Sequence, residues 1–320
     1  MVDGYSRLID YLRISITDRC NLRCRYCMPN DLDLIPHSQI LRYEEILRIC
    51  AISANLGIRR IKVTGGEPLV RKGCLGFLKR LKAVDGIESI SITTNGILLE
   101  PCVQAISEMG LDCVNISLDT LNPAVFAELS GMDALNLVLN SLHAALRAGL
   151  RVKVNCVLMR GINDGEILAI AELAEKYPVD VRFIELMPSE FGQEFIRFSG
   201  DEALSIIAHR FPGLKPESSF HGSGPAKYFT SPELLGSIGF IDAIGNCFCE
   251  GCNRIRLTSA GFLKLCLSHG DGLDLRAMLR SGATDIEMER AIEEAVRWKP
   301  KRHIFNEAQS VYMRMSQIGG

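Results

Sequence analysis

The stretch TDRCNLRCRYCMP, residues 17–29, brings three cysteines, Cys20, Cys24 and Cys27, within eight residues of one another. Thiols this close along the chain do not easily pair with one another as disulfides. Thiolate is the soft ligand that iron–sulfur clusters select, and a cubane normally takes four of them. No fourth cysteine lies nearby, so the spacing predicts a cluster with one open iron, which is typical of chemistry rather than scaffolding. The alternatives are a surface loop with incidental cysteines and an incomplete zinc site.

Size and composition indicate an ordinary globular enzyme. The chain has 320 residues, of which 47% are hydrophobic and 23% charged, and its net charge is −2. Such a chain can bury a large core, whereas it has no overall basic field for nucleic acid. No apolar leader and no run of 18 or more apolar residues occur, so we expect no membrane span and a cytoplasmic location.

Cysteine usage agrees with a reducing compartment. The chain has 12 cysteines, and in a cytosolic protein of this size clustered cysteines favour metal ligation. Six fall in two tight clusters, and we expect the others to be small buried hydrophobic residues. These others are Cys50, Cys74, Cys102, Cys113, Cys156 and Cys247.

Short β-branched runs alternate with helical patterns, which predicts βαβ units and a parallel sheet. Six such units are too few for a closed eightfold barrel, so we expect an α/β fold with a partial (β/α)6 barrel. The runs begin at Tyr11, Arg59, Ser89, Cys113, Val152 and Val181. The helical patterns include residues 43–57, 76–84 and 164–177, with Gly57 and Gly149 placed as helix C-terminal glycines.

Unusual residues gather where these predicted strands end, the edge at which parallel α/β folds form active sites. The segments are 20–27, 65–68, 93–96, 117–119 and 187–188. After about residue 190 the βα pattern weakens and Gly and Pro become frequent. We therefore predict a barrel domain at residues 1–210 and a smaller C-terminal region at residues 211–320, carrying the second cysteine cluster.

The first cluster, C-x3-C-x2-C, together with the motif Gly65-Gly66-Glu67-Pro68, resembles the radical S-adenosylmethionine (SAM) superfamily. The resemblance implies a [4Fe–4S] cluster on Cys20, Cys24 and Cys27 whose open iron is chelated by SAM. It also implies reductive cleavage of SAM to methionine and a 5′-deoxyadenosyl radical. The positions that match the family's SAM contacts are Tyr26, Gly66, Glu67, Ser117 and Met187. Tyr26 and Met187 fit equally well as core residues.

A second incomplete triad lies near the C-terminus, with the spacing C-x2-C-x13-C at Cys249, Cys252 and Cys266. From the residues alone it could hold an iron–sulfur cluster or a structural zinc ion. A zinc site normally has four ligands, and His269 or Cys247 could supply the fourth.

The context of this triad, FCEGCNRIRLTSAGFLKLCL, with KPKRHIFN at residues 299–306 and the terminal Gly319-Gly320, resembles the GTP 3′,8-cyclase family of molybdenum cofactor biosynthesis. The resemblance covers essentially the whole chain. It implies a second [4Fe–4S] cluster that contacts the guanine of GTP, and conversion of GTP to (8S)-3′,8-cyclo-7,8-dihydroguanosine 5′-triphosphate. It further implies catalytic roles for Arg254 and Arg256 and for the double glycine, which reaches into the active site.

A buried triphosphate requires several cations, preferably arginines. Matching the family's motifs gives Arg13, Lys62, Lys153, Arg182, Arg254 and Arg256 as phosphate contacts, with Thr93 and Ile255 also at the substrate. Lys62 departs from the family's usual arginine, which keeps the charge but loses bidentate geometry. Arg254 and Arg256 alternate along a predicted strand and so share a face.

The same resemblance implies partners: a flavodoxin- or ferredoxin-type reductant, a downstream cyclic pyranopterin monophosphate synthase and a homodimer. Two other functions stay open. One is a different radical SAM enzyme with an auxiliary cluster, such as a peptide-modifying maturase, although such enzymes typically carry more C-terminal cysteines. The other is a non-catalytic iron–sulfur or zinc regulator, which would have no need of the glycine motif at residues 65–68.

Overall fold

All six predicted β runs form strands in the computed structural model, which describes residues 1–28, 33–219, 221–305 and 315–318. The prediction of βαβ units is therefore confirmed. The strands are β1 (Tyr11–Ser15), β2 (Arg60–Thr64), β3 (Ser89–Thr94), β4 (Cys113–Ser117), β5 (Val152–Leu158) and β6 (Val179–Glu185).

The chain packs as two compact units that interleave along the sequence. The first comprises residues 1–21, 31–92 and 249–320, and the second comprises residues 22–30 and 93–248. The last two residues of β3 belong to the second unit. The predicted boundary between residues 210 and 211 stays a prediction.

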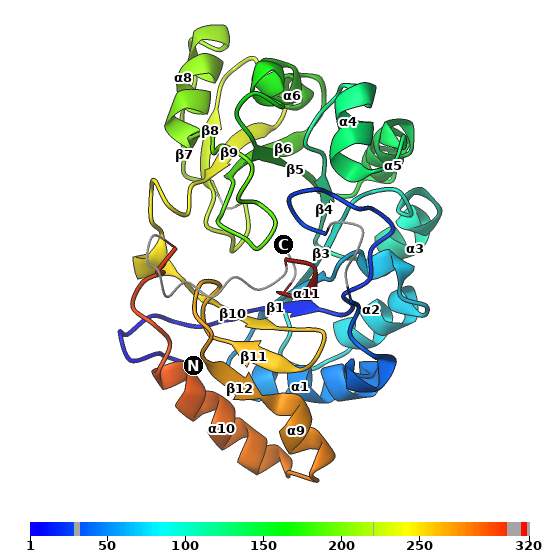
Figure 1. Cartoon of the computed structure of the whole chain (residues 1–320), viewed down its shortest axis with the longest axis vertical. Coiled ribbons are helices and arrows are strands. Elements are labelled where there is room, and N and C mark those ends of the chain that lie inside the picture. The colour runs from blue at the N-terminus through cyan, green and yellow to red at the C-terminus, as the bar shows by residue number, and fades with distance from the viewer. Residues whose placement is uncertain (29–32, 220, 306–314, 319–320) are drawn as a thin grey trace. The chain divides into compact units, whose positions relative to one another are not determined.

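In the first unit, the strands follow the order β12-β11-β10-β1-β2-β3. Strand β10 (Arg254–Leu257) pairs with β1 in parallel, whereas β11 (Phe262–Lys264) and β12 (Gly272–Asp274) are antiparallel. The C-terminal segment thus returns to extend the sheet beside β1 (Figure 1).

Helices of the first unit cover one side of these strands, and α10 packs against α1 and β12 (Figure 1). Helix α10 begins with a capping box, in which Thr284 Oγ1 accepts a hydrogen bond from Glu287 N–H and the Glu287 carboxylate accepts one from Thr284 N–H. The helices are α1 (Tyr43–Asn55), α2 (Cys74–Lys82), α9 (Leu275–Arg280), α10 (Asp285–Arg297) and α11 (Met315–Ile318), with short 3-10 turns η1 (His37–Gln39), η2 (Pro68–Val70) and η5 (Cys249–Gly251).

The second unit repeats this plan with the strand order β4-β5-β6-β9-β8-β7. Strand β9 (Ser237–Ile241) is parallel to β6, and β8 (Lys227–Thr230) and β7 (Lys215–Glu217) are antiparallel. Its helices are α3 (Val103–Glu108), α4 (Pro123–Ser130), α5 (Leu135–Arg147), α6 (Ile167–Ala171), α7 (Leu173–Lys176) and α8 (Gly200–Arg210), with 3-10 turns η3 (Glu100–Cys102) and η4 (Asp164–Glu166).

Alternation along the strands separates an apolar face from a polar one. In β1, Leu12 and Ile14 are fully buried, and Arg13 between them points to the opposite face. Gly57 and Gly149 follow α1 and α5 with φ of +95° and +71°, which confirms them as helix C-terminal glycines. The helix expected at residues 164–177 is instead divided into η4, α6 and α7.

The expectation for the scattered cysteines is partly wrong. Cys50, Cys74, Cys113 and Cys156 are buried, but Cys102 is half-buried and Cys247 is exposed. No helix in the described residues is both long enough and apolar enough to cross a membrane.

Candidate functional site

The glycine motif follows β2 directly and lies against the backbone that leads into the first cysteine. Gly66 N–H donates to Thr17 O over 2.7 Å, and Glu67 N–H donates to Arg19 O over 2.8 Å. A Cβ added to Gly66 would lie 2.4 Å from Arg19 O, so a residue with a side chain does not fit there. The motif therefore fixes the entry to the cysteine loop, whatever else it binds.

Asp18 and Arg19 shape the same loop. The Asp18 carboxylate, which is 2% exposed, accepts from Arg19 Nη1 over 2.7 Å and from Ile35 N–H over 2.6 Å. Arg19 Nη2 in turn donates to Ile35 O over 3.1 Å. These bonds tie the residues before Cys20 to the segment before η1, because a buried carboxylate is stable only with such donors.

Cys24 and Cys27 lie in the second unit on a tight turn. Cys27 N–H donates to Cys24 O over 2.9 Å, and both sulfurs are half-buried. Arg23 N–H donates to Ser130 O over 2.8 Å and Arg25 N–H to Leu129 O over 3.0 Å. The turn is therefore fastened to the end of α4 on either side of Cys24.

Tyr26, between these cysteines, packs against a small apolar cluster that includes Leu129 and Phe195. Its hydroxyl donates to Asp119 Oδ2 over 2.6 Å, and Asp119 Oδ1 accepts from Val157 N–H over 2.8 Å. Burial raises the pKa of Tyr26 well above its usual value, and the Asp119 charge adds to this. Because the hydroxyl is engaged, a SAM contact by Tyr26 would have to use other atoms, and that role stays a prediction.

Hydrogen-bond donors lie close to two sulfurs of the second triad. His303 N–H lies 3.4 Å from Cys249 Sγ, and Arg254 Nη2 lies 3.9 Å from Cys252 Sγ. Donors to sulfur stabilise thiolates and tune metal centres. Cys266 follows β11 and is half-buried like the other two.

A buried lysine adds charge at this triad. Lys299 is 2% exposed, and its Nζ donates to Leu265 O. Burial alone would raise the pKa of Cys252, but Lys299 and then Arg254 outweigh this effect and lower it to about 7. Cys266 also interacts with the Lys299 charge. A lowered thiol pKa favours the thiolate form that binds metal.

A zinc site at this triad needs a fourth ligand, and His269 is poorly oriented to supply it. Its Nε2 faces Arg302 O at 3.1 Å, so the ring is turned toward a carbonyl. Cys247, the other candidate, is exposed, and its Sγ, the Sγ of Cys249 and a ring nitrogen of His303 lie within 4.8 Å of one another, so the zinc alternative stays open. The donor set of Cys249, Cys252 and Cys266 fits an iron–sulfur cluster, which remains a prediction.

Three of the predicted phosphate contacts lie in one row across adjacent strands. Arg13 in β1 is paired with Arg256 in β10 on one side and with Lys62 in β2 on the other. Residues in register on neighbouring strands share a face, so the sheet brings these cations together. Arg254 lies on the same face, two residues from Arg256. Ile255 points its side chain to the opposite face, where it is 1% exposed, so a substrate contact there would use its backbone.

Lys153, in the second unit, already has three partners. Its Nζ forms an ion pair with Asp180 Oδ2 at 2.9 Å and donates to Tyr228 Oη over 2.9 Å and to His221 O. An ammonium group has only three N–H donors. A phosphate contact would therefore have to replace one of these bonds, and the predicted role is untested.

Arg182, also in the second unit, is 5% exposed and bonds to two amides. Its Nε donates to Asn155 Oδ1 over 2.8 Å, and its Nη2 donates to Asn115 Oδ1. Both acceptors are neutral, so they hold the guanidinium without cancelling its charge. These bonds use two of about five N–H donors.

The other predicted contacts lie at strand ends. Thr93 is in β3, Ser117 ends β4 and Met187 follows β6. Within the residues that the structure describes, Thr93 Oγ1 is buried and makes no hydrogen bond, as expected of a hydroxyl that awaits a ligand. Gly319 and Gly320 lie outside the described residues.

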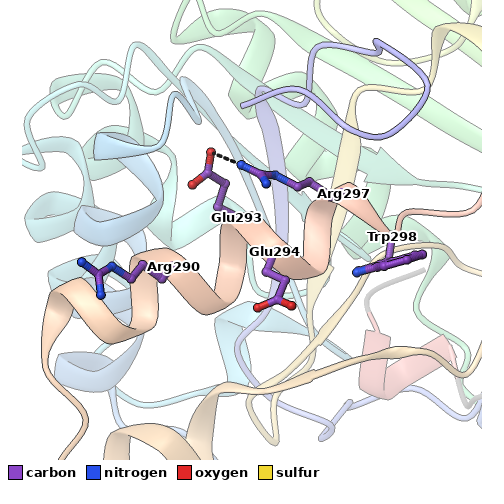
Figure 2. A pocket seen from close by; sticks show the side chains of 5 residues that line it. All are labelled: Arg290, Glu293, Glu294, Arg297 and Trp298. Atoms are coloured by element: carbon purple, nitrogen blue, oxygen red, sulfur yellow. Dashed lines mark hydrogen bonds and ion pairs between the residues drawn. The ribbon is translucent and has the colours of Figure 1, made fainter.

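A surface hollow on α10 contains none of these residues. Figure 2 shows its lining side chains, with Arg297 paired to Glu293 at 3.4 Å and the exposed Trp298 at the helix end. It offers neither thiols nor a concentration of cations, so it is not the candidate site.

Sequence reasoning missed several residues at the site. Arg7 is 8% exposed and donates to the carbonyls of Cys249, over 2.8 Å, and Pro300, over 2.6 Å. Asp119 holds Tyr26, and Lys299 lies beside Cys252. Arg7 lies in no recognisable motif, and Asp119 and Lys299 lie in segments that the sequence singled out without these roles, because their partners are distant along the chain.

Comparison with known proteins identifies the family of the chain. Residues 14–174 match the Radical SAM superfamily, and residues 179–305 match the family Molybdenum Cofactor Synthesis C. A protein of Heliobacterium modesticaldum named GTP 3′,8-cyclase is 45% identical, with all of both chains covered. One of Clostridium perfringens with the same name is 44% identical, again over all of both chains.

The chain belongs to the GTP 3′,8-cyclase family of radical SAM proteins. Among solved structures, Streptococcus suis SuiB bound to S-adenosylmethionine has a TM-score of 0.63 at 14% identity, covering 91% of this chain and 68% of its own. That likeness concerns the fold alone. The predicted fold class, an α/β fold of radical SAM type with a large parallel sheet, is confirmed.

Proposed function

We propose that this protein converts GTP to (8S)-3′,8-cyclo-7,8-dihydroguanosine 5′-triphosphate, the first step of molybdenum cofactor biosynthesis. Family membership supports the substrate and the reaction class. The structural observation that carries the proposal is the row of Arg13, Arg256 and Lys62. Arg256 lies in β10, which begins two residues after Cys252, and the paired strand β11 ends two residues before Cys266. The cations of this row would bind an anionic substrate, and the nearby thiolates would bind a metal centre.

Each cysteine triad has its own role in this proposal. Cys20, Cys24 and Cys27 would hold a [4Fe–4S] cluster with SAM on its open iron, and Cys249, Cys252 and Cys266 would hold a second cluster against the guanine. When bound, the first cluster would supply the electron that cleaves SAM to the 5′-deoxyadenosyl radical, which removes hydrogen from C3′ of GTP. Gly66 supports the SAM role by fixing the backbone that leads into Cys20.

The chain's own residues bind and orient the nucleotide. The strand cations and Arg254 would hold the triphosphate, which carries about four negative charges. Thr93 would donate or accept through its buried hydroxyl. Such positioning matters because a radical formed on one carbon must be aligned with a single acceptor atom. Arg182 and Lys153 are further proposed phosphate contacts, and Gly319 and Gly320 would act at the substrate.

A reductant of flavodoxin or ferredoxin type and a downstream cyclic pyranopterin monophosphate synthase would complete the pathway. A homodimer and a cytoplasmic location are further proposals. They follow from the family resemblance and from cysteine usage.

The decisive experiment is anaerobic incubation of the reconstituted protein with SAM, dithionite and GTP, followed by mass analysis of the nucleotide. We expect deoxyadenosine and a cyclised GTP product, together with about eight irons per chain. SAM cleavage without any change in GTP would contradict the proposal. About four irons with one zinc would contradict the second cluster.

A further inference from the structure

Residues 299–305, part of the sequence that carries the family resemblance, have no role in the proposed function. In the structure they lie beside the loop between β11 and β12, which contains Cys266. Three polar contacts join this segment to the loop: Lys299 Nζ to Leu265 O, Ile304 N–H to Ser268 Oγ and His269 Nε2 to Arg302 O. The segment therefore holds the loop on both sides of Cys266.

Ser268, two residues after Cys266, is 1% exposed. Its Oγ accepts from Ile304 N–H over 3.0 Å and lies 3.6 Å from Cys266 Sγ. A metal-bound cysteine is a thiolate and has no proton to donate, whereas a hydroxyl has one proton and two lone pairs. Because Ile304 N–H occupies one lone pair, the hydroxyl proton of Ser268 is available for the Cys266 thiolate.

Each sulfur of the second triad thus has a hydrogen-bond donor. The pairs are His303 N–H with Cys249 Sγ at 3.4 Å, Arg254 Nη2 with Cys252 Sγ at 3.9 Å and Ser268 Oγ with Cys266 Sγ at 3.6 Å. Hydrogen bonds to sulfur are among the factors that set the reduction potential of an iron–sulfur cluster. The first donor is a backbone group and the second belongs to a proposed substrate contact. The hydroxyl of Ser268 is therefore the donor whose removal changes least besides the bond itself.

We propose that Ser268 is a positioning residue of the second metal centre, whose hydroxyl, oriented by Ile304 N–H, donates to the Cys266 thiolate and raises the reduction potential of the cluster. This inference rests on the proposed function, in which the second triad holds a [4Fe–4S] cluster. Reduction adds one electron to the cluster, and no bond forms or breaks. The added negative charge strengthens a hydrogen bond to sulfur, so the bond favours the reduced form. The alternative is that Ser268 only satisfies Ile304 N–H and holds the loop.

The two roles differ in the quantity that they change. A hydrogen bond to the thiolate changes the midpoint potential of the second cluster at unchanged iron content. A bond that only holds the loop changes the free energy of unfolding or the retention of iron, and leaves the potential of the retained cluster as it was. Iron, zinc and urea unfolding are therefore measured on every sample.

The potential is measured by anaerobic redox titration of the reconstituted holoenzyme with dithionite, followed by electron paramagnetic resonance. SAM is added to half of the samples. In the proposed function SAM binds to the first cluster, so the signal that SAM does not change belongs to the second. This measurement does not depend on turnover of GTP.

Three variants are compared with the unaltered protein. Ser268→Ala should retain about eight irons and shift the reduction equilibrium of the second cluster about tenfold toward the oxidised form, which lowers the potential by about 59 mV for one electron. Ser268→Thr keeps the hydroxyl and should stay within about twofold of the original equilibrium. Ser259→Ala removes another buried hydroxyl, one that makes no hydrogen bond within the described residues, and should leave the potential unchanged.

If Ser268→Ala does not fold or does not retain its iron, Ser268→Val is compared with Ser268→Thr, because the two side chains have nearly the same size and differ in the hydroxyl. A lower potential in Ser268→Val than in Ser268→Thr would then support the proposal. Equal potentials in the variants with and without the hydroxyl, or an equal shift in Ser259→Ala, would overturn the role of Ser268 and leave the proposed function intact. About four irons in the unaltered protein, with or without zinc, would overturn this role together with the proposed second cluster. Two clusters without cyclisation of GTP would overturn the proposed reaction alone.

Discussion

The two units of this protein both bury cations on their strands, but they surround them differently. In the first unit, Arg256 has cations on both neighbouring strands, at Arg13 and Lys264. In the second unit, Lys153 is bound to Asp180, and Arg182 to two asparagines. The two units otherwise share a plan, with a parallel section extended by antiparallel strands on one side.

The difference separates two kinds of buried charge. A cation that has internal acceptors contributes to folding, and removing it leaves those acceptors unsatisfied. A cation placed among like charges opposes folding, and its presence is explained by a ligand that it binds. Burial and the Arg254 charge lower the pKa of Arg256 to about 10, while Tyr11, Cys252 and Cys266 act in the opposite direction.

The largest expected effect is the loss of cyclised product when a cysteine of the second triad is replaced. Cys252→Ser should leave SAM cleavage detectable but reduce the cyclised product by about a thousandfold or more, because it removes a proposed cluster ligand. Product is measured by mass spectrometry, and iron should fall from about eight to about four per chain.

The matched control for this change is Cys247→Ser, an exposed cysteine outside both triads. It should retain both the metal and the product. Loss of metal in Cys247→Ser would favour the zinc alternative, and full product yield in Cys252→Ser would exclude a substrate role for the second triad.

The next largest expected effect is on the free energy of unfolding and concerns the second unit. Lys153→Met should lower the free energy of unfolding by about 3 kcal/mol, because it removes the closest cation of the buried Asp180 and leaves it only His221 and the more distant Arg151. Burial would raise the pKa of Asp180, but Lys153 and then His221 lower it below its usual value. That contribution to stability is therefore present above the unfolded pKa of about 3.9 and is lost as pH falls through the folded pKa. Urea unfolding at several pH values measures both effects.

The double variant Lys153→Met, Asp180→Asn provides the control for this change. It should be less destabilised than the sum of the two single variants, because the charges are removed together. Unchanged stability in Lys153→Met, with a loss of GTP affinity, would place Lys153 with the ligand-binding cations and end the distinction between the units.

Much of this arrangement could be predicted from the sequence because it is local. Strand β2 and the glycine motif are adjacent along the chain, and so are β10 and Cys252. Alternation along β10 already placed Arg254 and Arg256 on one face. The register between neighbouring strands could not be predicted from the sequence pattern. Arg256 pairs with Lys264 and with Arg13, and no local pattern indicates which residues of two separate strands lie opposite each other. A three-residue strand such as β11 also carries too little periodicity to be identified.

The hydrogen-bond and ion-pair partners of individual side chains could not be predicted from the sequence either. Lys153 matches a phosphate contact of the family, yet only the structure shows that it contacts Asp180 and Tyr228. Nothing in the motif around Cys249 indicates that Arg7 donates to its carbonyl. Such contacts depend on tertiary packing, which overrides local pattern.

A smaller effect is expected at the centre of the cation row. Arg256→Met should weaken GTP binding by about tenfold to a hundredfold, since it removes a charge-assisted contact. The apo protein should be as stable as the original or more so, because repulsion with Arg254 is relieved. Calorimetric GTP binding and urea unfolding are measured on the same sample. A large loss of stability would show that Arg256 is structural.

The smallest effect concerns Lys62, where the chain departs from the arginine that the family usually has. Lys62 is in register with Arg13, so Lys62→Arg places a second guanidinium about 4.8 Å away in the same row. The added guanidinium can bind phosphate through two parallel hydrogen bonds, whereas the ammonium acts as a single, more strongly hydrated charge. We therefore expect GTP affinity to rise only about twofold to threefold, because the charge itself is unchanged, and Lys62→Met to lower it by several times that factor. If Lys62→Met binds GTP as the original does, the row of phosphate-binding cations ends at Arg13.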